Sequence, residues 1–236
     1  MKEKDRCRGD FMPGRSEILN AIEDYDSKKH SEEFYDFCLG KISRAVEPDE
    51  QLENAVRHLF YWFLGKVHVA GNSPIESVKV GDTLYQISEA APNSKAGIEE
   101  AVKKANLWAG LAFRNNGLPF ENFQNYAKSI TSGSIVMPAF FIHIFKPYEY
   151  PILNDRVWAA YRDELGKSVY INTKPANWDN YMEYAGYCSY LKRKFDLTLR
   201  QIDKGLWVIG DRCKEKARNT ESTETDGDAG QVGLFN

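Results

Sequence analysis

The sequence has few of the residues that build metal and redox centres. It contains four cysteines and four histidines among 236 residues, and no two cysteines form a C-x-x-C pair. These residues are Cys7, Cys38, Cys188 and Cys213, with His30, His58, His68 and His143. None of the spacings is typical of a zinc or iron–sulfur site, and isolated thiols are typical of a reducing compartment. We therefore expect no metal, no cofactor and a cytoplasmic location.

Long apolar runs are also missing. No stretch of about 18 apolar residues, the length of a membrane helix, occurs in the chain. The N-terminal MKEKDRCRGD is charged and has no apolar signal region. We therefore expect no membrane partner. The apolar run FFIHIF at 140–145 predicts a buried helix in which His143 is a hydrogen-bonded core residue.

A strong charge of one sign is absent as well. The formal net charge is −3, so local basic clusters are more informative than the total. One cluster is Lys192, Arg193 and Lys194 with Arg200 and Lys204, and the other is Lys146, Arg156, Arg162 and Lys167. Each cluster is compatible with nucleic-acid binding or with an ordinary solvated helix face.

What the sequence does contain is helical periodicity. With 42% apolar and 13% aromatic residues, the chain can bury a substantial core. Apolar residues recur at helical spacing, which predicts a mostly α-helical fold. The expected helices cover residues 17–25, 32–44, 51–65, 99–113, 120–128, 139–145, 156–165, 178–195 and 198–209. The alternating run 78–87, with its Gly81-Asp82 pair, predicts one short β-hairpin.

The stretch 130–160 carries the most specific order of parts. A Ser132-Gly133-Ser134 turn lies between two helical segments, where the backbone N–H groups of residues 133–135 could hold a phosphate. An apolar helix follows, and Pro147 and Pro151 then end it. The next residues are Asn154, Asp155 and Arg156, at a helix start. Such a pair is either a helix N-cap or a catalytic group.

This order resembles the helix-hairpin-helix DNA glycosylase superfamily, in which an L-P-G-V-G-x-K hairpin, an apolar helix and a P-x-x-D-T-H-V-like segment follow one another. The matching residues here are Ile130-Thr131-Ser132-Gly133-Ser134-Ile135-Val136 and Pro151-Ile152-Leu153-Asn154-Asp155-Arg156-Val157. The resemblance implies a two-lobed helical fold, double-stranded DNA as partner, and excision of a modified or damaged base in DNA repair. It also implies DNA contacts by the hairpin residues Ser132, Gly133, Ser134 and Ile135, and from the second basic cluster we expect Lys146 and Arg156 to bind DNA.

Two departures from the family pattern affect the implied chemistry. Bifunctional members carry a Schiff-base Lys after the hairpin, whereas this chain has Ile135, Val136 and Met137. The resemblance therefore implies a monofunctional enzyme. The position of the family's Asp is occupied by Asn154, with Asp155 one residue later. Either Asp155 performs the role of that Asp, or Asn154 assists by orienting a water, or the protein is a catalytically silent DNA-binding or adaptor protein. A helical interaction protein without a nucleic-acid role is a third interpretation.

The C-terminal segment has a different composition. From Lys214 onward, KEKARNTESTETDGDAG lacks large apolar residues, so we expect residues 214–236 to be a disordered tail after a helical domain over 1–213. The expected lobes of that domain are roughly 1–95 plus 170–213, and 96–169. The tail ends in Gln231-Val232-Gly233-Leu234-Phe235-Asn236, which resembles a sliding-clamp-binding peptide. In that resemblance Leu234 and Phe235 fill an apolar pocket while Gln231 binds at its rim.

Overall fold

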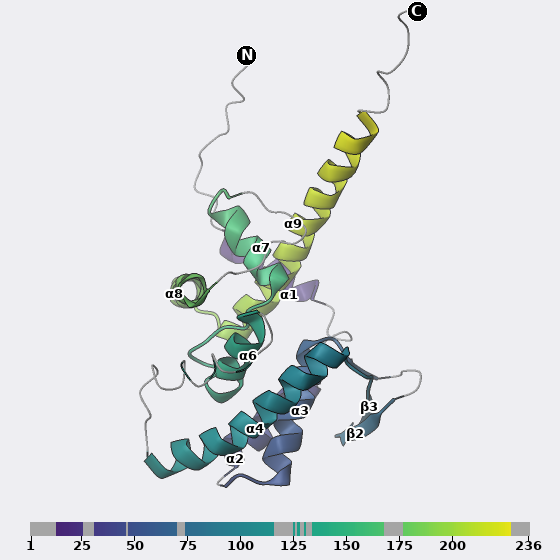
Figure 1. Ribbon diagram of the computed structural model, residues 1–236. Helices are drawn as coiled ribbons and strands as arrows, with labels where there is room; N and C mark the ends of the chain where they lie inside the picture. Colours follow the sequence, from purple (N-terminus) through teal and green to yellow (C-terminus); the bar gives the residue numbers. More distant parts are fainter. Residues whose placement is uncertain are drawn as a thin grey trace, which may run out of the picture. The chain divides into compact units, whose positions relative to one another are not determined.

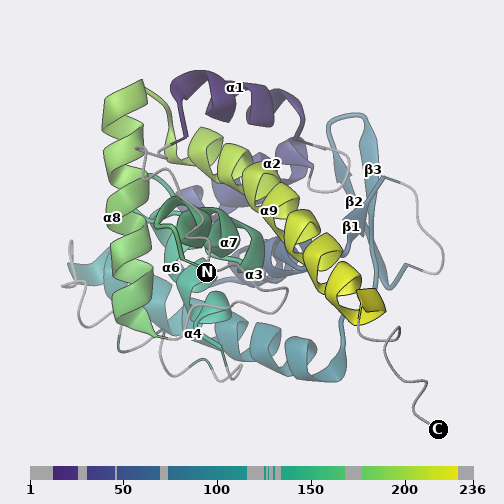
Figure 2. The ribbon, with the colours of Figure 1, turned by 90° about the horizontal axis from the view of Figure 1, so that it is seen from above.

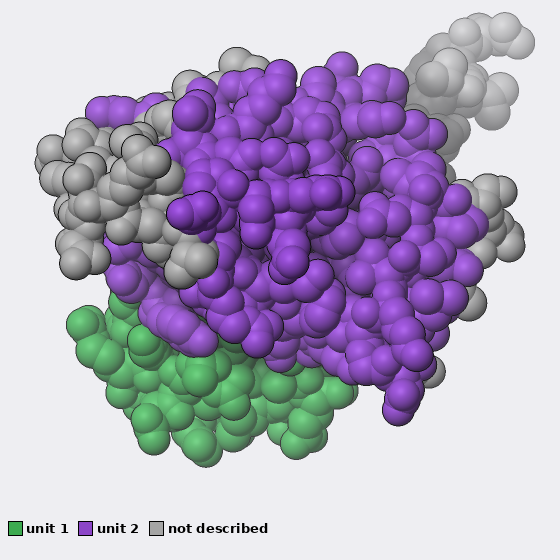
Figure 3. Space-filling model, turned by 90° about the horizontal axis from the view of Figure 1, so that it is seen from below, with its two compact units in different colours: residues 1–25, 152–236 green, residues 26–151 purple. Residues whose placement is uncertain are grey.

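A computed structural model describes residues 13–25, 31–45, 47–69, 74–115, 125, 127, 130, 134–167 and 177–227. Over these residues the fold is mostly α-helical, with eight helices and one small antiparallel sheet, which confirms the expected class (Figure 1). The chain forms two compact units, residues 1–25 with 152–236 (unit 1) and residues 26–151 (unit 2), coloured in Figure 3. This division differs from the predicted lobes, because local periodicity does not reveal which helices pack together.

The described residues of unit 2 contain four helices, two of which begin at a capping residue. They are α2 (Glu32–Arg44), α3 (Glu50–Phe63), α4 (Pro92–Asn115) and α6 (Val136–Phe145). Ser31 caps α2 by accepting the N–H of Phe34 at 3.4 Å, and Asp49 caps α3 by accepting the N–H of Leu52 at 2.8 Å. The expected helix at 120–128 lies almost wholly outside the described residues.

The expected hairpin is present and belongs to a three-stranded sheet. Strands β2 (Glu76–Val80) and β3 (Thr83–Ile87) pair antiparallel, with Val80 opposite Thr83. The two residues between them are Gly81 and Asp82, and Gly81 has a φ of +57°, which suits its place in a two-residue turn. The short strand β1 (Val67–His68) extends the sheet on the other side of β3, giving the order β1-β3-β2.

The core of unit 2 is aromatic and includes the predicted core histidine. The ring of Phe140 stacks on Phe63 with centroids 4.1 Å apart, and Phe60 meets it edge-on at 5.2 Å. His143 is 1% exposed, and its Nδ1 lies 2.7 Å from the Tyr150 carbonyl oxygen, to which it must donate. Its Nε2 then accepts from the Tyr35 hydroxyl at 2.6 Å. His143 is therefore the hydrogen-bonded core residue expected from the sequence.

Unit 1 is built around the long helix α9 (Leu199–Gly227). Helices α1 (Arg15–Glu23) and α7 (Asp155–Glu164) pack against it, as Figures 1 and 2 show. Two glycines allow these close approaches: a Cβ at Gly205 would lie 2.8 Å from the side chain of Ile18, and one at Gly210 would collide with the backbone carbonyl of Arg156. The glycines of α9 therefore determine where α1 and α7 cross it.

Helix α8 (Trp178–Phe195) completes unit 1 and has the predicted bounds. Its aromatic residues recur every three positions, and their burial changes along the helix as such a drifting stripe requires. Tyr181 and Tyr184 are fully buried, whereas Tyr190 is 41% exposed. The middle of the stripe is therefore core packing, whereas Trp178 and Tyr187 are partly exposed and Tyr190 is exposed.

The expected disordered tail is wrong for its first part. Helix α9 continues through Lys214 to Gly227, and Lys214 itself is buried. Composition alone was misleading here, because a helix that is already packed extends more easily than a new helix begins. Residues 228–236, with Gln231, Leu234 and Phe235, lie outside the described residues.

Candidate functional site

The polar residues at the start of α7 follow a segment that is fixed by buried groups. Asp203 of α9 is 2% exposed and accepts the N–H of Ile152 on both carboxylate oxygens at 3.2 Å. Tyr184 of α8 donates its hydroxyl to the carbonyl oxygen of Ile152, also at 3.2 Å. Both backbone groups of Ile152 thus have buried side-chain partners. Residues 152–154 are therefore held in place against α8 and α9.

Asn154 is the N-cap of α7. It is extended (φ −146°, ψ 179°), and its side-chain oxygen accepts the N–H groups of Arg156 at 2.9 Å and Val157 at 3.1 Å. This is the capping alternative left open by the sequence. The amide oxygen is occupied by two backbone donors, and the side chain has no charge, so Asn154 is poorly suited to activate water or stabilise a cation.

Asp155 is the first residue of α7 and is paired with Lys214 of α9. The Lys214 ammonium donates a hydrogen bond to Asp155 Oδ2. The Lys214 side chain is 7% exposed, whereas that of Asp155 is 42% exposed. Burial opposes ionisation of Asp155, but the hydrogen bond and charge of Lys214, with the charge of Arg156, lower its pKa below the ordinary value. Asp155 is therefore an ionised, half-exposed carboxylate with a buried cation on one oxygen.

Arg156 makes its contacts to the same helix. Its Nε lies 2.7 Å from Asp211 Oδ1, and its guanidinium lies over the Trp207 ring, 4.5 Å from the centroid. The side chain is 35% exposed. Arg156 was expected to bind a phosphate, and a phosphate would have to share it with Asp211.

The partners of this motif belong to a single face of α9. Residues spaced by four and three along a helix lie on one side of it. We use the name α9 stripe for the residues with that spacing, Arg200, Lys204, Trp207, Asp211 and Lys214. Of these residues only Arg200 and Lys204 were predicted from the sequence, although the spacing of the other three was visible there.

Tyr25 connects the first part of the α9 stripe. Its hydroxyl accepts from Arg200 at 3.2 Å, and its ring lies 5.6 Å from the Arg200 guanidinium and 5.5 Å from the Lys204 ammonium. The same ring meets Trp207 edge-on, with centroids 5.6 Å apart. Cations and aromatic rings thus alternate from Arg200 to Arg156, within unit 1.

The remaining predicted DNA-contact residues are in unit 2 or outside the described residues. Lys146 follows α6 and pairs with Glu149 at 3.2 Å. Ser134 Oγ accepts the N–H of Val136 at 3.3 Å, and Ile135 is buried. Ser132 and Gly133 lie outside the described residues, so the hairpin itself stays a prediction.

The described thiols are poor candidates for chemistry. Cys38, Cys188 and Cys213 are buried and free, and burial raises the pKa of Cys38 and of Cys213 to about 12. These three thiols are therefore poor nucleophiles at neutral pH. Among the described residues, no group of three or more His, Cys, Asp or Glu side chains is arranged to hold a metal ion. No helix in the described ranges is long and apolar enough to cross a membrane.

Comparison of the chain with protein-family models, with curated proteins and with solved structures gave no match.

Proposed function

We propose that this protein binds double-stranded DNA on a scaffold of the helix-hairpin-helix glycosylase type. The observation that carries the proposal is the α9 stripe, which joins the Asn154-Asp155-Arg156 motif to a row of cations and aromatic rings. Cations attract the phosphate backbone through a term that depends on salt and hardly on sequence. Aromatic rings beside them offer faces on which an unstacked base can lie.

The contacts of the motif favour binding without base excision. Excision needs a negative group to stabilise positive charge on the deoxyribose as the base leaves. Asn154 is neutral and caps α7, and Asp155 carries the Lys214 ammonium on Oδ2. A cation in direct contact cancels much of the field that Asp155 would exert on a sugar. We therefore place the catalytically silent DNA-binding role first.

Monofunctional excision is the second candidate, favoured by the state of Asp155. Its lowered pKa keeps it ionised at neutral pH, and its side chain is 42% exposed. Under this candidate, Asp155 assists cleavage of the N-glycosidic bond. Lys214 is an amine beside it, but at 7% exposure its access to a sugar is restricted, so we expect an intact abasic site as product. Covalent trapping of the protein on DNA by borohydride would contradict this.

Two assays separate these candidates. Fluorescence anisotropy with a labelled duplex, over a series of salt concentrations, tests binding. Replacing Arg200 and Lys204 by Gln should reduce the slope of log K against log salt by about two, since each lost phosphate contact removes about 0.9. The matched control replaces the exposed Lys79 and Lys103 of unit 2 by Gln. An unchanged slope in the Arg200/Lys204 variant would argue against the α9 stripe as a contact surface.

Base release from a panel of modified-base duplexes tests excision. Release that Asp155→Asn abolishes while duplex affinity is kept would support the second candidate. Because that variant also leaves Lys214 unpaired, the companion variant Asp155→Asn with Lys214→Met controls for folding. No release from any duplex by a protein that binds DNA would support the silent role.

Docking of the C-terminal peptide to a sliding clamp is a proposal based on the sequence alone. Helix α9 ends at Gly227, and Gln231 follows four residues later. The helical part from Lys214 to Gly227 is about 20 Å long at about 1.5 Å per residue, so it offers a stiff extension. A fluorescent peptide covering residues 231–236 and the preceding linker, titrated with the host's clamp, tests the proposal. Substituting Leu234 and Phe235 by Ala should abolish binding.

A further inference from the structure

The corner between α8 and α9 brings basic residues together around a tight turn. Helix α8 ends at Phe195, Asp196 takes a left-handed conformation with a φ of 53°, and α9 begins at Leu199. Thr198 and Gln201 form a reciprocal cap, with Thr198 N–H to Gln201 Oε1 at 2.9 Å and Gln201 N–H to Thr198 Oγ1 at 3.1 Å. The geometry of the corner is thus well defined by local hydrogen bonds.

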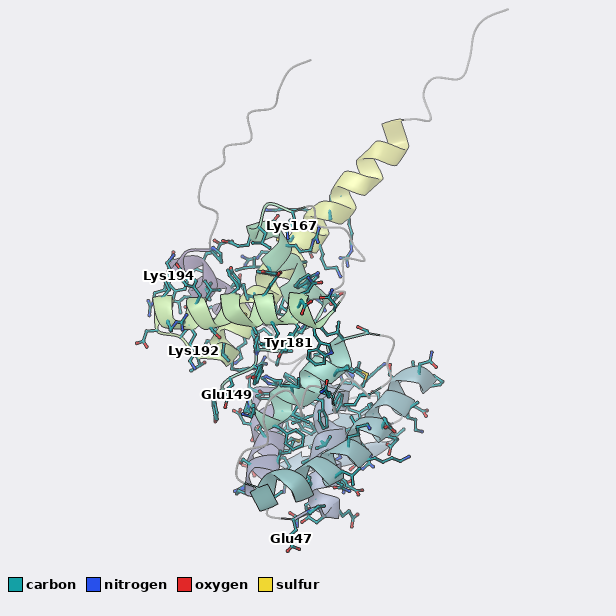
Figure 4. All side chains as sticks on the ribbon, turned by 60° about the vertical axis from the view of Figure 1, so that its left-hand side comes forward. Glu47, Glu149, Lys167, Tyr181, Lys192 and Lys194 are labelled. Carbon is teal, nitrogen blue, oxygen red and sulfur yellow. The ribbon has the colours of Figure 1, made fainter. Side chains whose placement is uncertain are left out.

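Five cations flank this turn. Lys192, Arg193 and Lys194 form the last turn of α8 and are exposed, and Arg200 and Lys204 follow in the first turns of α9. Figure 4 shows Lys192 and Lys194 at this end of α8. Carboxylates also lie near the corner: Asp196 is exposed, and Glu164 interacts with Lys194 as well as with Glu17 and Asp163. Lys192, Arg193 and Lys194 are nevertheless three consecutive exposed cations in a chain whose net charge is −3.

Helix stability explains only part of this arrangement. Cations at the C-terminal end of α8 interact favourably with the helix dipole. At the N-terminal end of α9 the same dipole disfavours cations, and α9 has no acidic residue in its first turn. Arg200, the second residue of α9, is nevertheless there, in contact with Tyr25. A negatively charged partner would compensate this arrangement on both sides of the turn.

The apolar residues of the corner turn inward. Phe195, Leu197 and Leu199 are all buried, so the turn presents charge and backbone without an apolar side chain that could insert into a lipid layer. A duplex meets this requirement, because it carries one negative charge per about 1.7 Å of its axis and needs no apolar anchor.

We propose that the α8–α9 corner is a second contact surface for the phosphate backbone of duplex DNA, formed by Lys192, Arg193 and Lys194 next to the cations of the α9 stripe. This inference rests on the proposed DNA-binding function and extends it to residues outside the Asn154-Asp155-Arg156 motif. The contact is electrostatic and reads no base sequence.

The test uses the full chain with Lys192, Arg193 and Lys194 replaced by Gln. The control replaces Lys66, Lys79 and Lys103 of unit 2 by Gln, which removes the same net charge. Anisotropy titrations with a labelled duplex over a salt series should show a slope of log K against log salt that is smaller by about two to three in the corner variant only. Circular dichroism should show both variants to be folded, because all six side chains are at least partly exposed.

The outcomes are distinguishable. If the wild type binds the duplex, and the Arg200/Lys204 variant reduces the salt slope while the corner variant does not, the corner proposal is overturned and the proposed function stands. Equal losses in the corner and control variants would overturn it too, since net charge alone would explain them. No duplex binding by the wild type overturns both. Binding to phosphatidylserine vesicles in place of the duplex would assign the corner to a membrane surface.

Discussion

Lys214 is more deeply buried than Asp155, so we expect the two single substitutions to lower the free energy of unfolding by different amounts. Asp155→Asn leaves an ammonium that is 7% exposed without its anion, whereas Lys214→Met leaves a carboxylate that is 42% exposed and can be hydrated. Removing one member of a fully buried pair costs about 3–5 kcal/mol, and exposed pairs contribute about 0–1 kcal/mol. We therefore expect Asp155→Asn to lower the free energy of unfolding by about 2–3 kcal/mol, and Lys214→Met by about 1 kcal/mol or less.

The double variant measures the coupling free energy between Asp155 and Lys214. In Asp155→Asn with Lys214→Met, the unpaired buried ammonium is gone, so the double variant should be more stable than Asp155→Asn alone. Urea unfolding followed by circular dichroism, with linear extrapolation to water, measures all three free energies. If Lys214→Met costs as much as Asp155→Asn, and the double variant equals their sum, the stem of Lys214 stabilises the fold and the ion pair does not.

The pH dependence of the same pair has a definite sign. The pKa of Asp155 is lowered from its ordinary 3.8, with burial opposing and Lys214 and Arg156 favouring the charged form. The unfolded state then binds more protons near that pH, so stability from the pair is present above about 3.8 and is lost as the pH falls through the lower folded-state pKa. Asp155→Asn should flatten this acid decline. An unchanged decline would mean that other carboxylates produce it.

Three further predictions concern the stability of the two units, the first two in unit 1 and the third in unit 2. Burial, with neighbouring carboxylates, raises the pKa of Glu164 to about 7, so the free energy of unfolding should fall as the pH rises from about 4.5 to 7. In urea unfolding, Glu164→Gln should therefore gain about 1 kcal/mol at about pH 8, after solvent screening, but little at about pH 5. Gly210→Ala should cost about 2–3 kcal/mol because its Cβ meets the backbone of α7, whereas Gly186→Ala, with open space, should be neutral or stabilising in thermal melts. Tyr35→Phe leaves His143 Nε2 without its donor and should cost about 1–3 kcal/mol in the same melts; no change would indicate that another group replaces the hydroxyl.

The spacing of apolar residues correctly predicted those helix bounds that depend on neighbouring residues in the sequence. The bounds of α2 and α8 match the expected 32–44 and 178–195, and the turn at Gly81-Asp82 is where the alternating run placed it. The start of α4 was expected at 99 but lies at Pro92, because Pro at the first helical position was not considered as a start signal. Strand β1 was missed, since two residues carry no periodicity.

Only one part of the candidate site could be predicted from the sequence, namely the residues that follow one another at the start of α7. Asn154 as a cap and Asp155 at the helix start follow from the residues themselves. Their partners do not, because Lys214 is 59 residues from Asp155 and Asp211 is 55 residues from Arg156. Only the packing of α7 across Gly210 brings these charges together. Whether Asp155 is free to act on a sugar is therefore a property of α9, and the motif alone could not reveal it.

The C-terminal half of α9 is helical where the sequence predicted a disordered tail, and the Asp155–Lys214 pair lies at the start of this half. A composition without large apolar residues argues against an independent fold, and the residues after Lys214 have that composition. The helix does not have to begin there, however, because the residues before Lys214 are packed against α1 and α7. The first turn of the extension then needs only ordinary helix propensity, which the sequence EKAR at 215–218 supplies, since all four residues are good helix formers. The Asp155–Lys214 pair lies where the packed part ends. The same contact therefore neutralises the candidate catalytic carboxylate and holds the start of the extension.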